Sequence, residues 1–379
     1  MDSKKYKVNK VNAYNGWDPL KQVVLGNVFD PEIFENIGDH KLRDLLQQIL
    51  YETYEDLMGI KKTLEDLGVE VIQPPRNALN YFKDNDNVFD LDSKMSGMTG
   101  LPRPCITPRD DFLTLGNKLL ATTVGMGDSG KMFNPKCIDM YLQEQWNLYQ
   151  DGKIPHGPLK PTGVGLGEKL GPIESTFNFW APAVHRVGNK LIVDQEDWSN
   201  IDEILLERYP EFTSANVTVG GHTDGSMNLP KPGLVICAPW MGPDDFKDTL
   251  PGWDVLKIEH PNYMQGENFE NWFEDKQITK GKWWTPEAKS NPELVKFVED
   301  WLTNWVGFAE ESVFEVNMLS VSEEVILSMN YQPEVHNALK KHGIEPIYCR
   351  FRHRNFWDGG LHCLTLDTVR EGGIQDYFK

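Results

Sequence analysis

The sequence feature that most constrains the fold is a pattern of strand, Gly-Asn turn and strand that occurs twice. Residues 111–120 are DFLTLGNKLL, and residues 184–193 are VHRVGNKLIV. Glycine and asparagine accept the backbone angles of a tight turn, so each segment is predicted to form a β-hairpin. Apolar residues at helical spacing follow each hairpin, and the pattern therefore predicts a repeated unit of two strands, a helix and a further strand.

Other parts of the chain fit the same unit, and together they give about five modules, of which the second and fourth fit loosely. In chain order, the predicted elements are strand 23–27, helix 41–67 and strand 68–72; hairpin 111–120 and helix 135–149; hairpin 184–193, helix 200–209 and strand 216–219; strand 233–237, helix 244–250 and strand 252–258; and strands 316–319 and 325–329, helix 333–342 and strand 343–349. Repetition at such a period indicates a stacked or closed array. We expect an α/β ring, because a ring leaves no terminal repeat exposed and lets side chains from different modules meet in a central channel.

Three stretches fall outside the modules. Residues 1–10 are polar and are predicted to be a flexible tail, which leaves residues 11–379 as a single domain. Residues 151–171 are rich in Gly and Pro, but no predicted strand enters them, so we expect a surface or lid loop and not a phosphate-binding loop. The Trp-rich stretch 268–305 is predicted to be an insertion, with an amphipathic helix over residues 291–308 that packs into the core.

Charge and cysteine content argue against several classes of protein. The formal charge of −19 argues against nucleic acid as a partner, because its recognition needs a basic face. The apolar runs fall short of the ~18 residues of a membrane helix, and the basic N-terminus lacks the apolar core of a secretory signal. Five cysteines without paired spacing favour neither a disulfide framework nor a zinc site. We therefore expect a cytoplasmic, reduced protein with no membrane partner, and its acidity would suit a small cationic substrate.

A cysteine near the end of the chain is the first candidate for chemistry. Cys363 follows Gly359, Gly360 and His362 and leads into alternating apolar residues. Two glycines allow the main chain or a ligand to approach closely, so a thiol at this turn would be open to substrate. The alternative is a buried structural cysteine, since unpaired cysteines are among the most buried residues.

Two further polar clusters strengthen the case for a functional cysteine. His222 and Asp224 stand two residues apart among three glycines, so on an extended segment both side chains point to one face. Asp110 lies just before a predicted strand, where binding residues tend to collect. Taken alone, His222 could be structural and Asp110 could belong to a solvated turn.

One cysteine, one histidine and two carboxylates suit guanidino chemistry. A guanidinium is planar, and a carboxylate can accept two of its N–H groups at once. Held between Asp110 and Asp224, a guanidinium would present its central carbon to the sulfur of Cys363. A nearby cation or His222 would lower the pKa of the thiol and favour the thiolate. His222 could then protonate the leaving amine and deprotonate the incoming nucleophile.

These residues stand in motifs that resemble those of the amidinotransferases, the glycine amidinotransferase and inosamine-phosphate amidinotransferase group of the guanidino-modifying superfamily. Residues 11–20, VNAYNGWDPL, look like the family's opening motif, and residues 108–110, 222–224 and 359–363 match its three active-site motifs in order. The resemblance runs nearly end to end. It implies a five-bladed, pseudo-symmetric α/β propeller of ββαβ modules around a central active-site channel, which is the ring that the repeats indicate.

The resemblance also implies a role for each residue. Cys363 would be the nucleophile, His222 the acid–base group, and Asp110 and Asp224 the guanidinium binders. Neither a metal nor an organic cofactor is implied, because the cysteine carries the transferred group. The implied partners are a small guanidino donor, arginine by family precedent, and a primary amine; a homodimer is compatible with the resemblance.

The chain departs from the family pattern at three positions. Ala183 stands where the family has a third catalytic carboxylate, so the usual partner that orients the histidine is expected to be missing. Met241 stands near the position of the family's carboxylate-binding arginine, and Gly221 replaces a bulky residue before the histidine. The first departure bears on the reaction rate, and the other two bear on substrate identity.

Three functions are open at the level of the sequence. The first is an amidinotransferase that passes the group from arginine to a primary amine through an amidino-Cys363 intermediate. The second is a hydrolase on the same scaffold, like an arginine deiminase or dihydrolase, in which water accepts the group. The third is a catalytically decayed protein that binds guanidino compounds, which Ala183 favours and the joint presence of Cys363, His222, Asp110 and Asp224 opposes.

Overall fold

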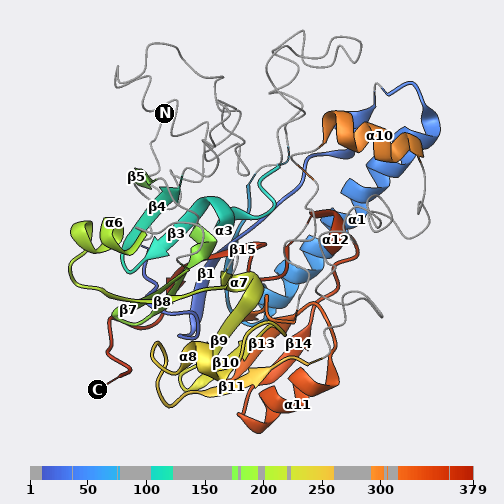
Figure 1. The fold of residues 1–379 in the computed structure, drawn as a ribbon. Coiled ribbons are helices and arrows are strands. Elements are labelled where there is room, and N and C mark those ends of the chain that lie inside the picture. Colours follow the sequence, from blue (N-terminus) through green and yellow to red (C-terminus); the bar gives the residue numbers. More distant parts are fainter. Residues whose placement is uncertain are drawn as a thin grey trace, which may run out of the picture.

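Five sheets of the same construction form the body of the molecule. The computed structural model describes residues 11–35, 37–74, 76, 104–122, 173–177, 181–194, 201–219, 223–259, 292–302, 305, 315–357 and 359–378. Within these ranges the chain forms five three-stranded sheets (Figure 1). In each sheet the central strand pairs antiparallel with one neighbour and parallel with the other. This is the strand arrangement that the predicted ββαβ unit requires.

The sheets follow one another along the chain, except that the first takes a strand from each end. With the central strand in the middle of each triple, the sheets are β15 (Thr365–Arg370), β1 (Leu20–Leu25) and β2 (Glu70–Ile72); β3 (Phe112–Leu115), β4 (Lys118–Thr122) and β5 (Ile173–Phe177); β6 (Val184–Val187), β7 (Lys190–Asp194) and β8 (Thr213–Val217); β9 (Met227–Lys231), β10 (Leu234–Cys237) and β11 (Asp254–Lys257); and β12 (Leu319–Ser320), β13 (Val325–Ser328) and β14 (Glu345–Tyr348).

Helices connect the parallel strands of four sheets within the described residues. These helices are α1 (His40–Asp66), α6 (Ile201–Arg208), α8 (Pro243–Phe246) and α11 (Pro333–Lys341). The other helical segments are η1 (Pro31–Phe34), α3 (Pro108–Asp111), η2 (Ala181–Ala183), α7 (Thr223–Ser226), α10 (Pro292–Trp301) and α12 (Arg354–Trp357). No helix in this part of the chain is long and apolar enough to cross a membrane.

The two predicted Gly-Asn hairpins are confirmed. Gly116 and Gly188 have φ angles of 56° and 64°, in the left-handed region that glycine enters without a Cβ clash. The strands on either side of each glycine pair in unbroken antiparallel register. The backbone N–H of Gly116 also donates to the carbonyl of Ala13 at 2.9 Å, and that of Gly188 to the carbonyl of Tyr14 at 2.9 Å. The hairpin turns therefore join the second and third sheets to the N-terminal segment.

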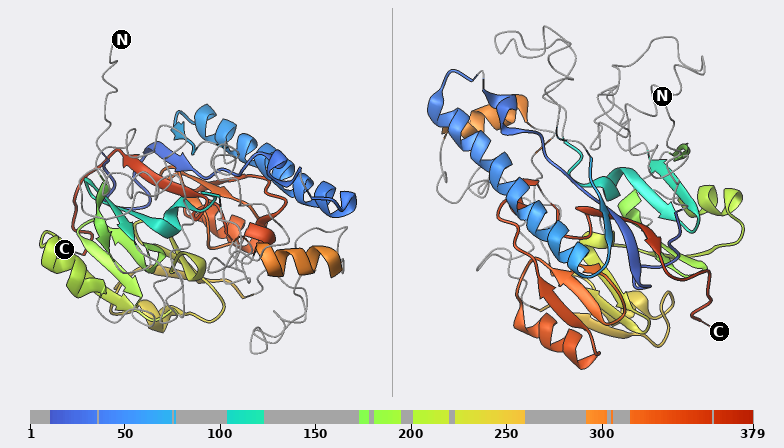
Figure 2. Two further views of the ribbon diagram at one scale, coloured as in Figure 1. Left: turned by 90° about the horizontal axis from the view of Figure 1, so that it is seen from above. Right: turned by 180° about the vertical axis from the view of Figure 1, so that it is seen from behind.

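Among the described residues, five clusters of buried apolar side chains join the sheets in pairs. Each cluster combines residues of two neighbouring sheets, with the fifth sheet packed on the first. Representative pairs are Val24 with Phe112, Leu113 with Leu191, Val187 with Val235, Ile236 with Ile326, and Leu327 with Leu25. Figures 1 and 2 show the sheets following one another around the molecule, with α1 along its outside.

The long helix α1 holds the segment that leads to the candidate cysteine. Arg352 donates from Nε to both carboxylate oxygens of Asp56, at 3.1 and 3.0 Å. The indole N–H of Trp357 donates to the hydroxyl of Thr53 at 2.8 Å, and both side chains are buried. A buried donor left without an acceptor costs ~1–3 kcal/mol, so these contacts fix the backbone just before Gly359.

Several predictions about single segments need correction. The helix predicted over residues 291–308 is α10, which ends at Trp301. Cys105 is disulfide-bonded, so the expectation of cysteines without a disulfide is wrong at this position; its partner lies outside the described residues. The predicted helix 135–149, the loop 151–171 and the tail 1–10 also lie outside them.

The sequence did not predict β5, β9 or the pairing of β15 with β1. β5 and β9 complete the second and fourth sheets, which are the modules that fitted the repeat loosely. β15 supplies the antiparallel strand of the first sheet from the other end of the chain.

Candidate active site

Cys363 lies at the entrance to β15 within a network of buried polar groups. Its side chain is 0% exposed. Oδ2 of Asp224 lies 3.3 Å from the sulfur of Cys363, and Nδ2 of Asn317 donates to the same sulfur at 3.0 Å. Asp224 comes from α7, and Asn317 precedes β12. The cysteine is buried as a structural cysteine would be, but its sulfur contacts an amide and a carboxylate.

The other cysteines with a free thiol lie in a different environment. Burial raises the pKa of Cys237 to about 12 and that of Cys349 to about 11. Both residues belong to apolar core clusters. At neutral pH they remain protonated, and a protonated thiol is a poor nucleophile.

Asn317 organises the loop that carries Cys363. Its Oδ1 accepts hydrogen bonds from the backbone N–H groups of His362 at 2.9 Å and of Cys363 at 3.1 Å. Its Nδ2 donates to the backbone carbonyl of Asp224 at 3.2 Å as well as to the cysteine sulfur. The side chain of Asn317 therefore connects the loop that carries Cys363 with the backbone of Asp224. This requires a side chain that has both donors and an acceptor. Sequence reasoning missed Asn317; the available signal was an amide within the apolar run before a strand.

The two glycines before Cys363 are required for close packing. A Cβ atom on Gly360 would lie 2.5 Å from Cβ and Oδ1 of Asn317. A Cβ atom on Gly359 would lie 3.1 Å from Cγ2 of Thr107 and 3.4 Å from Cβ of Cys363. The expected close approach of the main chain is therefore confirmed. The glycines do not open the room beside the thiol that we expected, because Asn317 and Thr107 take that space.

Asp224 lies in the helical turn α7, not on an extended segment as we expected. The hydroxyl of Thr223 donates to the carbonyl of Pro182, which docks α7 onto η2. Asp224 is 2% exposed, so the docked turn holds its carboxylate inside the molecule. His222 lies outside the described residues, and its predicted role as acid–base group stays a prediction.

His362 binds the carboxylate that contacts the cysteine. Nδ1 of His362 lies 2.7 Å from Oδ2 of Asp224, the oxygen that is also 3.3 Å from the sulfur of Cys363. Burial lowers the pKa of His362, the guanidinium of Arg109 lowers it further, and Asp224 opposes both effects. The sequence motif contained His362, but sequence reasoning gave it no role; its position next to Cys363 was the signal.

Helix α3 places Asp110 beside the cysteine loop. Asp110 is 3% exposed, and α3 leads directly into β3, as predicted. The preceding residue, Arg109, donates from Nε to the carbonyls of His362 and Thr365, both at 2.9 Å. These bonds dock α3 on the loop that contains Cys363. The motifs 108–110 and 359–363 therefore meet here, next to α7, which carries Asp224.

Asp367 binds three arginines inside the molecule, and we call these four residues the arginine hub. Its carboxylate oxygens lie 2.8 Å from Nη2 of Arg109, 2.7 Å from Nη2 of Arg186 and 2.6 Å from Nε of Arg370. Burial alone would raise the pKa of Asp367, but the three guanidiniums hold it well below its ordinary value. Nη2 of Arg370 also donates to the carbonyl of Ser320 at 2.9 Å. The hub thus connects the first, second, third and fifth sheets, and no sequence motif indicated it.

Two of the departures from the family pattern can be located. Ala183 is 2% exposed and packs in the cluster between the second and third sheets. Met241 is 3% exposed and packs in the cluster between the third and fourth sheets. Gly221 lies outside the described residues. In the part of the chain that the structure describes, no three His, Cys, Asp or Glu side chains gather as the ligands of a metal ion would.

Known proteins of similar sequence are amidinotransferases. No family model matches the chain. It is 22% identical over 399 residues to inosamine-phosphate amidinotransferase 1 of Streptomyces glaucescens. The alignment covers 97% of this chain and 99% of the relative. It is 26% identical over 412 residues to the mitochondrial glycine amidinotransferase of Xenopus laevis. This alignment covers 97% of this chain and 85% of the relative.

Solved structures show the same relationship in the fold. The inosamine-phosphate amidinotransferase of Streptomyces griseus superposes with a TM-score of 0.58 at 20% identity, over 97% of this chain and 99% of that one. The amidinotransferase of the saxitoxin biosynthetic pathway from Microseira wollei superposes with a TM-score of 0.59 at 17% identity, over 98% and 100%. The chain has the fold of these two proteins.

Proposed function

We propose that this chain, whose resemblance to the amidinotransferases is confirmed over nearly its whole length, moves an amidino group from a guanidino donor to a primary amine through an intermediate on Cys363. The observation that carries the proposal is the sulfur of Cys363 held between Asn317 Nδ2 at 3.0 Å and Asp224 Oδ2 at 3.3 Å. A guanidinium bound by this carboxylate has its central carbon within reach of the sulfur.

The first half of the reaction forms the intermediate. The guanidinium of the donor, arginine in our proposal, binds to the carboxylates of Asp224 and Asp110 through its paired N–H groups. The thiolate of Cys363 attacks the central carbon, the bond from that carbon to the donor nitrogen breaks, and His222 gives the departing amine its proton. The amidino group is then bound to sulfur.

The second half transfers the group. The acceptor amine attacks the same carbon, gives its proton to His222, and the carbon–sulfur bond breaks to restore the cysteine. Asn317 supports the sulfur whenever it carries negative charge, because its Nδ2 already donates to it. The sulfur carries the group between substrates, so the reaction as we propose it uses no cofactor and no metal.

The fold that we propose is a five-bladed, pseudo-symmetric α/β propeller with the site in its central channel. Five like sheets and five pairwise core clusters support this arrangement. Residues 11–379 would form this single domain, with 1–10 as a tail. We further propose that the protein acts in the cytoplasm, as a monomer or a homodimer, on small molecules and not on nucleic acid.

Mass spectrometry of the protein after mixing with arginine tests the proposal. A mass increase on Cys363 that persists until an amine is added supports a transferase. Fast release of urea or ammonia without an amine would mean that water is the acceptor. No adduct on Cys363 would contradict covalent transfer and leave binding as the remaining activity.

We propose an acceptor other than glycine, a larger amine or one without a carboxylate. Met241 stands near the position of the family's carboxylate-binding arginine and is buried in the core, and a buried carboxylate without a cation costs several kcal/mol. Steady-state kinetics across glycine, ornithine, diamines and amino sugars decide this point. Glycine with the highest kcat/KM would refute it and would direct attention to Arg186 or Arg354 as the binder of its carboxylate.

A further inference from the structure

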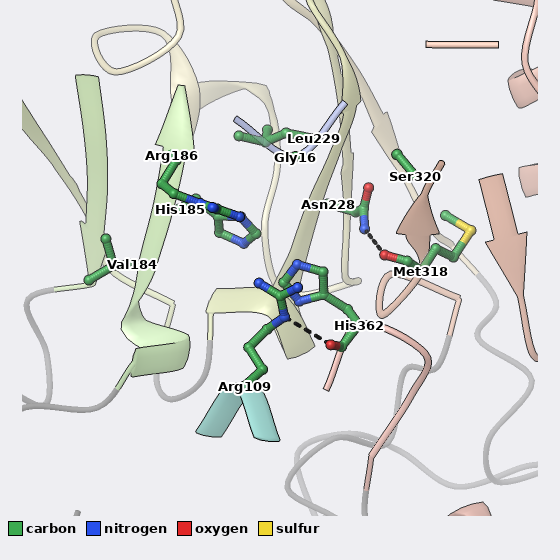
Figure 3. A pocket seen from close by; sticks show the side chains of 10 residues that line it. All are labelled: Gly16, Arg109, Val184, His185, Arg186, Asn228, Leu229, Met318, Ser320 and His362. Atoms are coloured by element: carbon green, nitrogen blue, oxygen red, sulfur yellow. Dashed lines mark hydrogen bonds between the residues drawn. The ribbon is translucent and has the colours of Figure 1, made fainter. Parts of the chain in front are cut away.

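A small polar pocket adjoins His362. Its cavity volume is about 30 Å³, compared with the ~10–15 Å³ that one water-sized sphere occupies. The described residues that line it are Gly16, Arg109, Val184, His185, Arg186, Asn228, Leu229, Met318, Ser320 and His362. Figure 3 shows the side chains of Arg109, His185, Arg186 and His362 converging in the middle of the view. The space fits a small ion and not a metabolite.

The guanidiniums that line the pocket belong to the arginine hub, where cations outnumber carboxylates. Arg109 and Arg186 are 5% and 6% exposed, and both share the carboxylate of Asp367 with Arg370. Arginine stays charged in proteins, so three positive charges meet one negative charge there. Two further carboxylates act near the hub: Asp18, whose charge interacts with Arg370 and Arg186, and Asp224, which is bound by His362. The described residues that line the pocket include two guanidiniums and no carboxylate, so its wall favours negative charge.

Two imidazoles complete the wall. His185 and His362 stack with ring centroids 5.8 Å apart, and Nε2 of His185 is enclosed without a hydrogen-bond partner among the described residues. Burial, His362, Arg109 and Arg186 lower the pKa of His185 to about 3, against the opposing effect of Asp224. Burial disfavours any charge in this space, but the two guanidiniums that disfavour a second proton on His185 favour an anion beside it.

We propose that this pocket binds one small monovalent anion, a halide or a carboxylate group, between the guanidiniums of Arg109 and Arg186 and the imidazoles of His185 and His362. Cys363 does not line the pocket, and the inference goes beyond the proposed function. His362 lines the pocket and also binds Asp224. An anion in the pocket therefore changes the surroundings of the carboxylate that contacts Cys363.

Bromide tests the proposal directly, because it scatters anomalously and resembles chloride in size. Crystals of the wild-type protein soaked in sodium bromide should show an anomalous peak within hydrogen-bond distance of His185 and the two guanidiniums. In solution, sodium bromide should raise Tm to a plateau relative to sodium gluconate at the same ionic strength, as a ligand of the native state does. Bromide peaks confined to the molecular surface would overturn the proposal, as would a Tm that does not respond.

Variants separate a built site from an adventitious ion. His185→Phe keeps a ring next to His362 but removes the N–H donor of His185, so we expect at least tenfold weaker bromide binding. His336→Phe is the matched control, because His336 is a buried histidine in α11 whose Nε2 likewise lacks a partner among the described residues, and it does not line the pocket. Equal losses in both variants, or no loss in His185→Phe, would mean an adventitious ion only. If His185→Phe fails to fold, the wild-type bromide map still decides.

Competition identifies the source of the anion. Arginine that displaces bromide, while agmatine without its carboxylate does not, would assign the pocket to a substrate carboxylate. Bromide retained in the presence of both compounds would assign it to a free anion. Neither reading depends on turnover, so the proposal can fail while amidino transfer stands, or stand while transfer fails.

Discussion

Two polar regions inside the molecule lie only four residues apart on the chain and are built in opposite ways. In the arginine hub, Asp367 is bound by three cations, with N–O distances of 2.6 to 2.8 Å. At the cysteine site, the sulfur of Cys363 contacts the neutral amide of Asn317 and the carboxylate of Asp224. Neither of these partners is positive. A guanidinium that binds there would bring a positive charge to Asp224, whereas three guanidiniums already bind Asp367 in the hub.

This comparison indicates which buried polar residues stabilise the fold and which serve the reaction. Replacing residues of the hub should change the free energy of unfolding, because its charges compensate one another in the folded state. Replacing residues of the cysteine site should change turnover and leave the fold largely intact. Each variant below tests one side of that division, in order of expected effect.

Cys363→Ala should have the largest effect and should act on turnover alone. Loss of a catalytic nucleophile costs on the order of 10⁶ in kcat where it has been dissected, and the substitution removes only the sulfur atom with its hydrogen bonds. Activity assays and urea unfolding measure the two quantities. Cys237→Ala is the control, because Cys237 is equally buried but packs in an apolar cluster, and we expect it to keep its activity. A tenth of wild-type activity in Cys363→Ala would rule out the covalent mechanism.

Asp367→Asn should have the largest effect on stability. Removing one partner of a buried ion pair costs ~3–5 kcal/mol, and here three arginines would lose their shared carboxylate. Because the pKa of Asp367 is depressed in the folded protein, this stabilisation is present above about pH 4 and is lost as the pH falls toward the folded pKa. Urea unfolding at several pH values measures both effects.

The control for the hub is an exposed ion pair on α1. Asp66 lies 2.5 Å from Nζ of Lys62, and both side chains are well exposed, at 64% and 73%. Asp66→Asn should change the unfolding free energy by at most ~0.5 kcal/mol. A similar small change in Asp367→Asn would show that the hub contributes no more than a surface pair.

Asp224→Asn and Asp110→Asn should weaken donor binding as well as chemistry. Each loses a charged acceptor of the guanidinium, and such hydrogen bonds contribute ~1.5–3 kcal/mol, roughly 10- to 150-fold in affinity. Calorimetric titration of arginine into variants that also carry Cys363→Ala measures binding without turnover. An unchanged affinity in both carboxylate variants would remove them from the guanidinium site.

Asn317→Leu should have a smaller effect, on the reactivity of the sulfur. It loses the donor that supports negative charge on Cys363, so kcat should fall by roughly 10-fold and alkylation by iodoacetamide should require a higher pH. Asn27→Leu is the control, because Asn27 is a buried amide that donates to a backbone carbonyl elsewhere. Parallel pH profiles for Asn317→Leu and the wild type would limit Asn317 to a structural role.

The sequence predicted what short segments determine by themselves. The turns at Gly116 and Gly188 follow from the conformational freedom of glycine, and the helix at residues 41–67 follows from its apolar spacing. The cysteine and the carboxylates were singled out by residue type and spacing, and the resemblance to a known family gave them their expected roles. Asn317 and the arginine hub were not predicted, because their roles depend on contacts between residues far apart in the chain. Arg186 and Asp367, for example, are 181 residues apart.

The first sheet joins strands from the two ends of the chain, and this feature has a consequence for the timing of synthesis. Leu20 of β1 pairs with Arg370 of β15. At about 5–20 residues per second on the ribosome, β15 emerges roughly 20–70 s after β1. Throughout this interval the edge of β1 lacks its partner, and the cysteine that precedes β15 does not yet exist. If Cys363 is the nucleophile that we propose, a nascent chain cannot react with guanidino compounds until this last part of the first sheet has been made.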